Sequence, residues 1–460
     1  MATALAFDAQ SAAVPFRGVH LDLKGLVPTF HRLLELVDIF YTLRIQAILV
    51  EWEDCFPWSC DPRLRAPHAY TKDQILQFAK RCDELGIEII PLVQSLGHSE
   101  NVLRLPGNES MREVPHRTDV FHPLAQGSPQ IVADMIRDVI ELIPGIKHFH
   151  LGGDEVYTLG KHPASKEFIE TYGIAELYLK QLQPSLILLK DNSIRPLLWH
   201  DEVVQWEDDQ IKVFAQDFDL VVWGYTGDPR NPETYHFRLP HIEKLHKLGC
   251  SIWGATSYKG ADGPWANLPD TLARAKATQG WAALTAQFGL KGIFITAWSR
   301  YASGRIQVTP IDGALDSLAY MAITLHNGQA PLDGIKTCIS VLDDLGEATH
   351  LASCKQLLCN FTTHVDRSWD WIRQLHEQKE NIKLEPTRAN SGIEEIIFDL
   401  LAQDITACRE FGEQLEQCLN GKVVAPLPQY YWESRLRAIE DASNQLVNDE
   451  ALCASSAALA

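Results

Sequence analysis

The residues best suited to chemistry lie in one run, His148-Phe149-His150-Leu151-Gly152-Gly153-Asp154-Glu155-Val156. Two glycines and two adjacent carboxylates follow an apolar lead-in, which is typical of a buried strand that ends in a tight turn and presents acids to a ligand. Successive strand residues point to opposite faces, so Asp154 and Glu155 can serve one site only where the strand gives way to a loop. The simpler alternative is a solvated loop with two charges, since exposed carboxylates are the default.

The elements around this run alternate between short apolar strands and helical stripes. We expect eight strands, at residues 19–23, 47–50, 87–93, 148–156, 196–199, 220–223, 250–253 and 292–298. Helical patterns separate them, and the one after Thr71 begins with the capping pair Thr71 and Gln74. Eight such β-α units predict an α/β fold of the (β/α)₈ TIM barrel type.

The chain of 460 residues is too long for a barrel alone. We expect a flexible N-terminus at 1–15, a catalytic barrel at 16–328 and a C-terminal α-helical domain at 329–460. Helical runs at 335–345, 351–363 and 367–378 support the last of these.

In such a barrel the loops after the strands form the active face. The expected strand ends carry acids, histidines and tryptophans: Lys24, Glu51 to Asp54, His98, Asp154, Glu155, Trp199 to Asp201, Trp223 to Tyr225, Trp253 to Tyr258 and Trp298 to Arg300. Carboxylates among indole rings suit a sugar, because a pyranose offers an apolar face to the ring and hydroxyls to charged groups. A single tryptophan is more often a core residue, but four at different strand ends favour a site.

Composition narrows the class of partner. With 60 acidic and 41 basic residues the formal charge is −19, which argues against nucleic acid and fits a neutral substrate. No secretory signal or membrane span is recognisable, so we expect an intracellular, cytoplasmic protein, with the nucleus as a second option. Ten cysteines without C-x-x-C spacing read as reduced thiols rather than a structural zinc site. We expect no cofactor, no metal and no membrane partner; a homodimer stays open.

The segment from His150 to Val156 resembles the H-x-G-G-D-E-V signature of glycoside hydrolase family 20, the β-N-acetylhexosaminidases. Leu96-Gly97-His98-Ser99 resembles the second signature of that family. The segments 20–25, 51–57 and 91–94 look like an intracellular branch that lacks the usual N-terminal accessory domain. The resemblance covers the barrel and is weak in the C-terminal domain.

The resemblance implies substrate-assisted hydrolysis, in which the 2-acetamido oxygen of the substrate attacks the anomeric carbon and gives an oxazoline. By the same resemblance Glu155 is the general acid and then base, and Asp154 accepts from the acetamido N–H. His98 belongs to a supporting relay with Asp54 behind it, and Glu53 competes for that place. An apolar surrounding and an anionic neighbour would raise the Glu155 pKa in the direction that a proton donor requires.

Other roles follow from the same family pattern. Trp199, Trp223 and Trp298 look like the indoles that enclose the acetamido methyl group, and Trp253 lies in the same set of strand ends. The tyrosine that hydrogen-bonds the acetamido carbonyl is either Tyr225 or Tyr258.

Two positions depart from the family pattern. Lys24 stands where an arginine is usual, and Arg300 stands where a glutamate is usual. Both contact hydroxyls away from the scissile bond, so the preference between gluco and galacto epimers is open, although the branch itself prefers galactosaminides.

Two rival functions remain. His98, His148, His150 and Asp154 could bind zinc in a metal-dependent hydrolase, although the tryptophans have no role there. A non-catalytic glycan-binding barrel is the second rival, because a fold alone does not fix function.

Overall fold

The protein is described by a computed structural model. It covers residues 2–7, 12–231, 239–262, 266–299, 309–385 and 393–447. Two compact units divide the chain, Met1–Ala348 and Thr349–Ala460. Within the described residues, no helix has the length and hydropathy that a membrane crossing needs.

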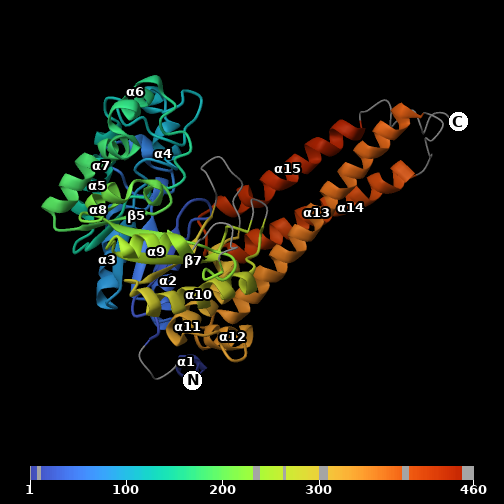
Figure 1. The fold of residues 1–460 in the computed structure, drawn as a ribbon. Helices are drawn as coiled ribbons and strands as arrows, with labels where there is room; N and C mark the ends of the chain where they lie inside the picture. Colours follow the sequence, from blue (N-terminus) through green and yellow to red (C-terminus); the bar gives the residue numbers. More distant parts are fainter. Residues whose placement is uncertain are drawn as a thin grey trace. The chain divides into compact units, whose positions relative to one another are not determined.

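The first unit contains a closed barrel of eight parallel strands in sequence order, which confirms the predicted (β/α)₈ fold (Figure 1). The strands are β1 (Arg17–Asp22), β2 (Ala47–Glu51), β3 (Glu88–Leu92), β4 (His148–His150), β5 (Arg195–Trp199), β6 (Asp219–Trp223), β7 (Ile252–Lys259) and β8 (Ile293–Ala297). The pairing of β1 with β8, from Arg17↔Ile293 to Val19↔Ile295, closes the barrel.

Helices and short 3₁₀ turns follow the strands around the barrel. Its larger helices are α2 (Phe30–Thr42), α3 (Lys72–Glu84), α5 (Ser128–Leu142), α6 (Pro163–Tyr172), α7 (Ile174–Asp191), α8 (Asp208–Phe214), α9 (Leu239–Lys247), α10 (Thr271–Phe288) and α11 (Leu315–Asn327). The capping box predicted at Thr71 and Gln74 is present at the start of α3. Gly173, with φ +90°, separates α6 from α7.

The barrel interior is filled by apolar side chains. Ten buried residues from six strands form this core: Ala47, Leu49, Ile90, Leu92, Leu197, Trp199, Val221, Trp253, Ala255 and Phe294. Packing of this kind makes the barrel a rigid support, so the residues that follow the strands have fixed positions.

Two parts of the predicted domain division differ from the structure. Residues 2–6 of the N-terminus form helix α1, and Thr3 donates to Asp344 at 3.0 Å, next to helix α12 (Ile335–Asp344). Because α12 also packs on α11, it belongs to the barrel unit. The boundary therefore lies at Ala348 instead of residue 328.

The second unit is helical, as predicted, and consists of α13 (Ala348–Leu384), α14 (Ile393–Leu419) and α15 (Leu427–Val447) in its described part (Figure 1). Helix α13 runs without a break through both helical segments expected there. Asp404 on α14 accepts from His364 at 2.6 Å and from Trp371 at 2.8 Å, which ties α13 to α14.

Candidate active site

Three polar residues that follow strands have backbone conformations that side chains rarely adopt. Glu53, His98 and Glu155 have φ values of +49°, +50° and +50°. They follow β2, β3 and β4, at the carboxyl ends of the barrel strands. Left-handed backbone at a residue other than glycine costs free energy and is concentrated at functional sites. The strand ends that the sequence singled out are therefore also the strained ones.

Asp154 and Glu155 meet at one histidine. The Nε2 atom of His98 lies 3.5 Å from Oδ2 of Asp154 and 3.3 Å from Oε2 of Glu155. Asp154 is 7% exposed, while Glu155 is half-buried. Both carboxylates reach one side of the mouth because β4 ends at His150 and the chain then turns through Gly152 and Gly153. The solvated-loop alternative does not fit this burial.

Two glycines permit this approach. A Cβ atom at Gly97 would stand 2.1 Å from the backbone oxygen of Asp154, so only glycine lets the β3 loop touch the β4 loop. Gly153 has φ +85° and a Cβ there would meet the hydroxyl of Tyr178, which donates to the Gly153 carbonyl at 2.8 Å. The contact between the β3 and β4 loops at Gly97 brings His98 to the carboxylates.

The two acids hold His98 in its charged form. Burial of the imidazole opposes protonation, but Asp154 and Glu155 outweigh burial and raise the pKa of His98 well above its usual value. An imidazolium between two carboxylates neutralises part of their mutual repulsion. The charge on His98 therefore lets the two carboxylates lie next to each other.

Asp201 is a site residue for which the sequence predicted no role. Its Oδ2 accepts the backbone N–H of Glu155 at 3.0 Å, and its Oδ1 accepts the indole N–H of Trp223 at 3.2 Å. Burial, reinforced by the charge of Asp154, raises the pKa of the Asp201 carboxyl to about 7. The signal in the sequence is its place two residues after Trp199, at the end of the fifth expected strand. Asp201 ties the ends of β4, β5 and β6 together.

Aromatic rings line the mouth around the acids. The centroids of Trp199 and Trp298 are 6.0 Å apart, and Tyr225 lies 6.1 Å from Trp298 and 5.6 Å from Trp223. The indole nitrogen of Trp199 is buried and has no hydrogen-bond partner among the described residues, whereas that of Trp298 is within hydrogen-bonding reach of Tyr225. Buried indole N–H groups are usually paired, so the Trp199 donor is available to a ligand.

The structure separates the two candidate tyrosines. Burial raises the pKa of the Tyr225 phenol well above its usual value, and Asp154 is the largest charged contributor. Burial also raises the pKa of Tyr258, but there the contributing charges are Asp22 and Asp312. Tyr225 thus stands beside the acidic pair, and Tyr258 does not.

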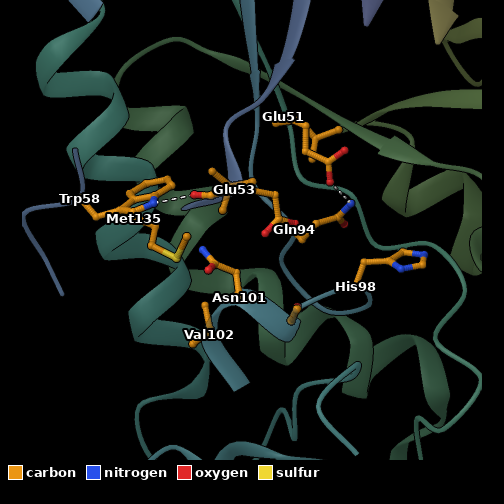
Figure 2. Close-up of a pocket in the computed structure, with 11 residues that line it drawn as sticks. Glu51, Glu53, Trp58, Gln94, His98, Asn101, Val102 and Met135 are labelled. Atoms are coloured by element: carbon orange, nitrogen blue, oxygen red, sulfur yellow. Dashed lines mark hydrogen bonds between the residues drawn. The ribbon is translucent and has the colours of Figure 1, made fainter. Parts of the chain in front are cut away.

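Lys24 lies in a cluster of carboxylates on the β1 and β2 side of the mouth. Its ammonium is 2.7 Å from Glu51, 3.1 Å from Asp22 and 4.0 Å from Glu53, and the side chain is 9% exposed. Burial opposes its charge, but Asp22 and Glu51 outweigh burial and raise the pKa of Lys24. Gln94 donates to Glu51 at 3.0 Å (Figure 2). Lys24 is therefore fixed by ion pairs.

Glu53 and His98 line the same pocket (Figure 2). Burial, reinforced by Glu51, raises the pKa of Glu53 to about 8 although Lys24 acts in the opposite direction. Asp54 lies 3.8 Å from Arg104. Its carboxylate is also close to the side chains of Cys55 and His68. The relay behind His98 stays a prediction. Glu53, which lines the same pocket as His98, fits it better than Asp54, which faces Arg104.

The prediction that Trp253 lies at the mouth is also wrong. Strand β7 begins at Ile252 and continues to Lys259, so Trp253 sits at its amino end. Its indole N–H donates to Asp219 at 2.9 Å, and its ring contacts Phe16 and His148 at the opposite end of the barrel. Trp253 is a core residue. Arg300, the remaining predicted contact, lies outside the described residues.

The ligand set of the metal-hydrolase rival is not assembled. His148 lies at the amino end of β4, where it contacts Glu88 at 2.7 Å. The Nδ1 atom of His150 accepts the Gly152 N–H at 2.9 Å. Among the described residues, the donors close enough together to hold an ion are Asp54, Cys55 and His68. Burial raises the pKa of the Cys55 thiol well above its usual value, which opposes the thiolate form that a metal needs.

Comparisons with known proteins point to one family. The family model "Glycosyl hydrolase family 20, catalytic domain" matches residues 57–234. Hexosaminidase D of Bos taurus is 32% identical over 323 residues, which is 68% of this chain and 92% of that protein. Hexosaminidase D of Homo sapiens is 32% identical over 322 residues, 67% of this chain and 65% of that protein. The match thus spans slightly less than two thirds of the human relative.

Solved structures share the fold at lower identity. A chitobiase from Flavobacterium johnsoniae is similar with a TM-score of 0.56 and 15% identity, over 95% of this chain and 72% of that chain. A β-N-acetylhexosaminidase from Bacteroides fragilis is similar with a TM-score of 0.54 and 13% identity, over 74% of this chain and 72% of that chain. These two likenesses concern the fold alone.

Proposed function

The chain belongs to glycosyl hydrolase family 20, and from that premise we propose that it is a retaining exo-β-N-acetylhexosaminidase. Its substrates are glycans or glycoconjugates that end in N-acetylgalactosamine or N-acetylglucosamine. The observation that carries the proposal is the Asp154 carboxylate. Its Oδ2 faces His98, while its Oδ1 is buried and accepts no hydrogen bond among the described residues. A buried acceptor in that state fits an N–H donor of the substrate.

Catalysis proceeds in two steps that use the carboxylates differently. The acetamido oxygen attacks the anomeric carbon and the bond to the leaving oxygen breaks, while Glu155 gives its proton to that oxygen. Asp154 accepts from the acetamido N–H and stabilises the positive charge of the oxazolinium ring. Glu155 then takes a proton from water, which attacks the same carbon and opens the ring. Two inversions at one carbon leave the product with the β configuration of the substrate.

The aromatic mouth provides the acetamido pocket. Trp199 and Trp298 enclose the methyl group, with Trp223 beside them, and Tyr225 donates its hydroxyl to the acetamido carbonyl. The support for Tyr225 is its place next to Asp154, with its ring 6.1 Å from that of Trp298. Because the acetamido group is already oriented, its attack is intramolecular and not bimolecular. This lowers the entropic part of the activation free energy of hydrolysis.

The sugar hydroxyls lie on the β1 and β2 side in this proposal. Lys24, with Asp22 and Glu51, offers both donors and acceptors there. Because Lys24 is a point charge held by carboxylates, it cannot form the bidentate hydrogen bonds that an arginine forms with a pair of hydroxyls. We propose a galactosaminide preference for this site. The intracellular location and the homodimer stay predictions.

One assay separates the enzyme from a glycan-binding barrel. Wild type and Glu155→Gln are compared on aryl N-acetyl-β-galactosaminide and aryl N-acetyl-β-glucosaminide, with binding measured in parallel. The proposal expects hydrolysis by wild type, and binding without turnover by the variant. Binding by both proteins without turnover by either would identify a glycan-binding protein instead.

A further inference from the structure

One aromatic residue stands outside the acetamido pocket and contacts the proposed proton donor. Tyr157 follows Glu155 by two positions and is 68% exposed, among the most exposed large side chains of the barrel unit. Its hydroxyl donates to Oε1 of Glu155 at 3.0 Å. Trp199 and Tyr258, by contrast, are fully buried. The Tyr157 ring is therefore the solvent-facing aromatic next to the acid.

The two oxygens of Glu155 have different neighbours. Oε2 lies 3.3 Å from Nε2 of His98, and Oε1 lies at the Tyr157 hydroxyl. Asp154 and Glu155 overcome the effect of burial and raise the pKa of His98, so the imidazolium donates toward Oε2. The proton that Glu155 gives to the substrate is then carried by Oε1. A hydroxyl can donate to Oε1 when Glu155 is ionised and accept from it when Glu155 is protonated.

The backbone fixes Tyr157 in this place. The N–H of Glu155 donates to Asp201 at 3.0 Å, and the N–H of Tyr157 donates to the Glu155 carbonyl at 2.8 Å. Val156 between them is 5% exposed and anchors the turn in the core. Because both sides of the turn are held, the ring stays at the rim instead of folding into the mouth.

We propose that Tyr157 forms the subsite for the leaving group, with its ring against the group bonded to the scissile oxygen. The inference rests on the proposed function. A proton donor stands between the two halves of the substrate, and Asp154 with Tyr225 occupies the half that binds the acetamido group. Tyr157, whose hydroxyl is hydrogen-bonded to Oε1 of Glu155, must therefore face the leaving group. The ring selects leaving groups that have an apolar face of their own, a second sugar or an aryl group, over small alkyl groups.

The test uses three substrates that share one N-acetylhexosaminyl group. They are a methyl glycoside, a 4-nitrophenyl glycoside and a β-linked disaccharide, and release of the free N-acetylhexosamine is measured for all three. Wild type is compared with Tyr157→Ala and Tyr157→Phe. Tyr41→Ala is the control, because Tyr41 is also exposed, at 53%, but lies near the end of α2 that leads to the amino end of β2.

Tyr157→Ala should raise KM for the disaccharide and the aryl glycoside about tenfold, the loss expected for one stacked ring, and leave KM for the methyl glycoside unchanged. Tyr157→Phe keeps the ring and should keep KM for all three. Tyr41→Ala should match wild type. Equal losses on all three substrates, or an unchanged KM for the disaccharide in Tyr157→Ala, would overturn the subsite. Failure of wild type on all three would instead overturn the proposed function, and the subsite with it.

Discussion

At the scale of single residues, the account depends on unequal tasks for two neighbouring carboxylates. Glu155 accepts a hydrogen bond from the Tyr157 hydroxyl at Oε1, and its Oε2 faces His98. The side chain is also partly open to solvent, which suits a group that exchanges protons. Asp154 is more buried and keeps one oxygen without a partner among the described residues, which suits a group that holds a donor. The tasks follow from these surroundings, since the side chains themselves differ by one methylene.

Replacing Glu155 by Gln removes the transferable proton and keeps the shape of the side chain. We expect kcat to fall by about 10²- to 10⁴-fold with little change in KM, the range typical of a lost general acid-base. Steady-state rates on the preferred aryl glycoside measure the effect, and thermal unfolding of the variant controls for folding. A variant that keeps more than half of the wild-type kcat would remove Glu155 from the mechanism.

Asp201 makes a prediction about pH. Its folded pKa of about 7 lies above the ordinary value of 3.8, so the folded protein binds this proton more tightly than the unfolded chain does. The stability that the proton contributes is present below about pH 4 and is lost as the pH rises toward 7. In Asp201→Asn this loss is absent. Urea unfolding is measured at several pH values between 4 and 7.5. The free energy of unfolding of the variant should rise relative to that of wild type as the pH rises. The same pH dependence in both proteins would contradict this.

Single residues were predictable from sequence where their direction follows from the strand end. Asp154, Glu155 and His98 meet as expected, because glycines and short strands define their positions. The directions of Glu53 and Asp54 were not predictable, because Glu53 has a left-handed backbone and begins a 3₁₀ turn. Backbone conformation of this kind is set by contacts with other loops, which a local pattern does not contain.

At the scale of elements, β7 shows why strand ends were misjudged. Its second half, from Ala255 to Tyr258, carries polar residues that looked like a loop. In the structure the hydroxyl of Thr256 pairs with Thr278 of α10 at 2.8 Å, and its carbonyl accepts from Thr296 at 2.7 Å. Polar residues whose bonds are satisfied can continue a buried strand. Trp253 therefore lies at the start of β7 and not at its end.

The contact between the β3 and β4 loops gives a prediction for Gly97. In Gly97→Ala the new methyl group meets the Asp154 carbonyl, where a Cβ would stand at 2.1 Å. The loops must separate, so kcat should fall at least tenfold, and the free energy of unfolding should fall by about 1–3 kcal/mol, as for other overpacked sites. Kinetics and urea unfolding measure the two effects.

Gly86→Ala is the control for Gly97→Ala. Gly86 has φ +67° and nothing within 4 Å of its Cβ position, so alanine there adds backbone strain without a clash. It should lose about 1–2 kcal/mol of stability and keep its kcat. If Gly97→Ala behaved like this control, the close approach of the loops would not position the site.

At the scale of the whole molecule, a buried network of ion pairs joins helix α2 of the barrel unit to the last residues of that unit. Arg32 on α2 donates to Asp312 at 2.8 Å and to Glu347 at 2.6 Å and 2.7 Å. The Arg32 and Asp312 side chains are 0% exposed. This network joins positions far apart in sequence and explains why the unit continues to Ala348, beyond the end of the eighth β-α repeat. Sequence periodicity predicted the repeats and could not show such a long-range pairing.

Arg32→Leu should remove the buried cation that Asp312 and Glu347 share. A buried pair that loses one member typically costs about 3–5 kcal/mol, so we expect a loss of that size in the free energy of unfolding. The matched control is Arg81→Leu, whose pair with Asp38 is exposed to solvent, so its loss should change the free energy of unfolding far less. Equal losses in the two variants, measured by urea unfolding, would contradict the structural role of the network.

The central claim is that the acetamido group of the substrate is the nucleophile and that Asp154 and Glu155 assist it. Fluorine on the acetyl group makes its oxygen a poorer nucleophile and leaves the leaving group unchanged. The most direct measurement is therefore kcat on aryl glycosides that carry acetyl, monofluoroacetyl, difluoroacetyl and trifluoroacetyl groups on the same amine. We predict hydrolysis of the acetyl compound and a steep fall in kcat with each fluorine. Rates that do not depend on fluorine, or no hydrolysis of the acetyl compound, would contradict the account.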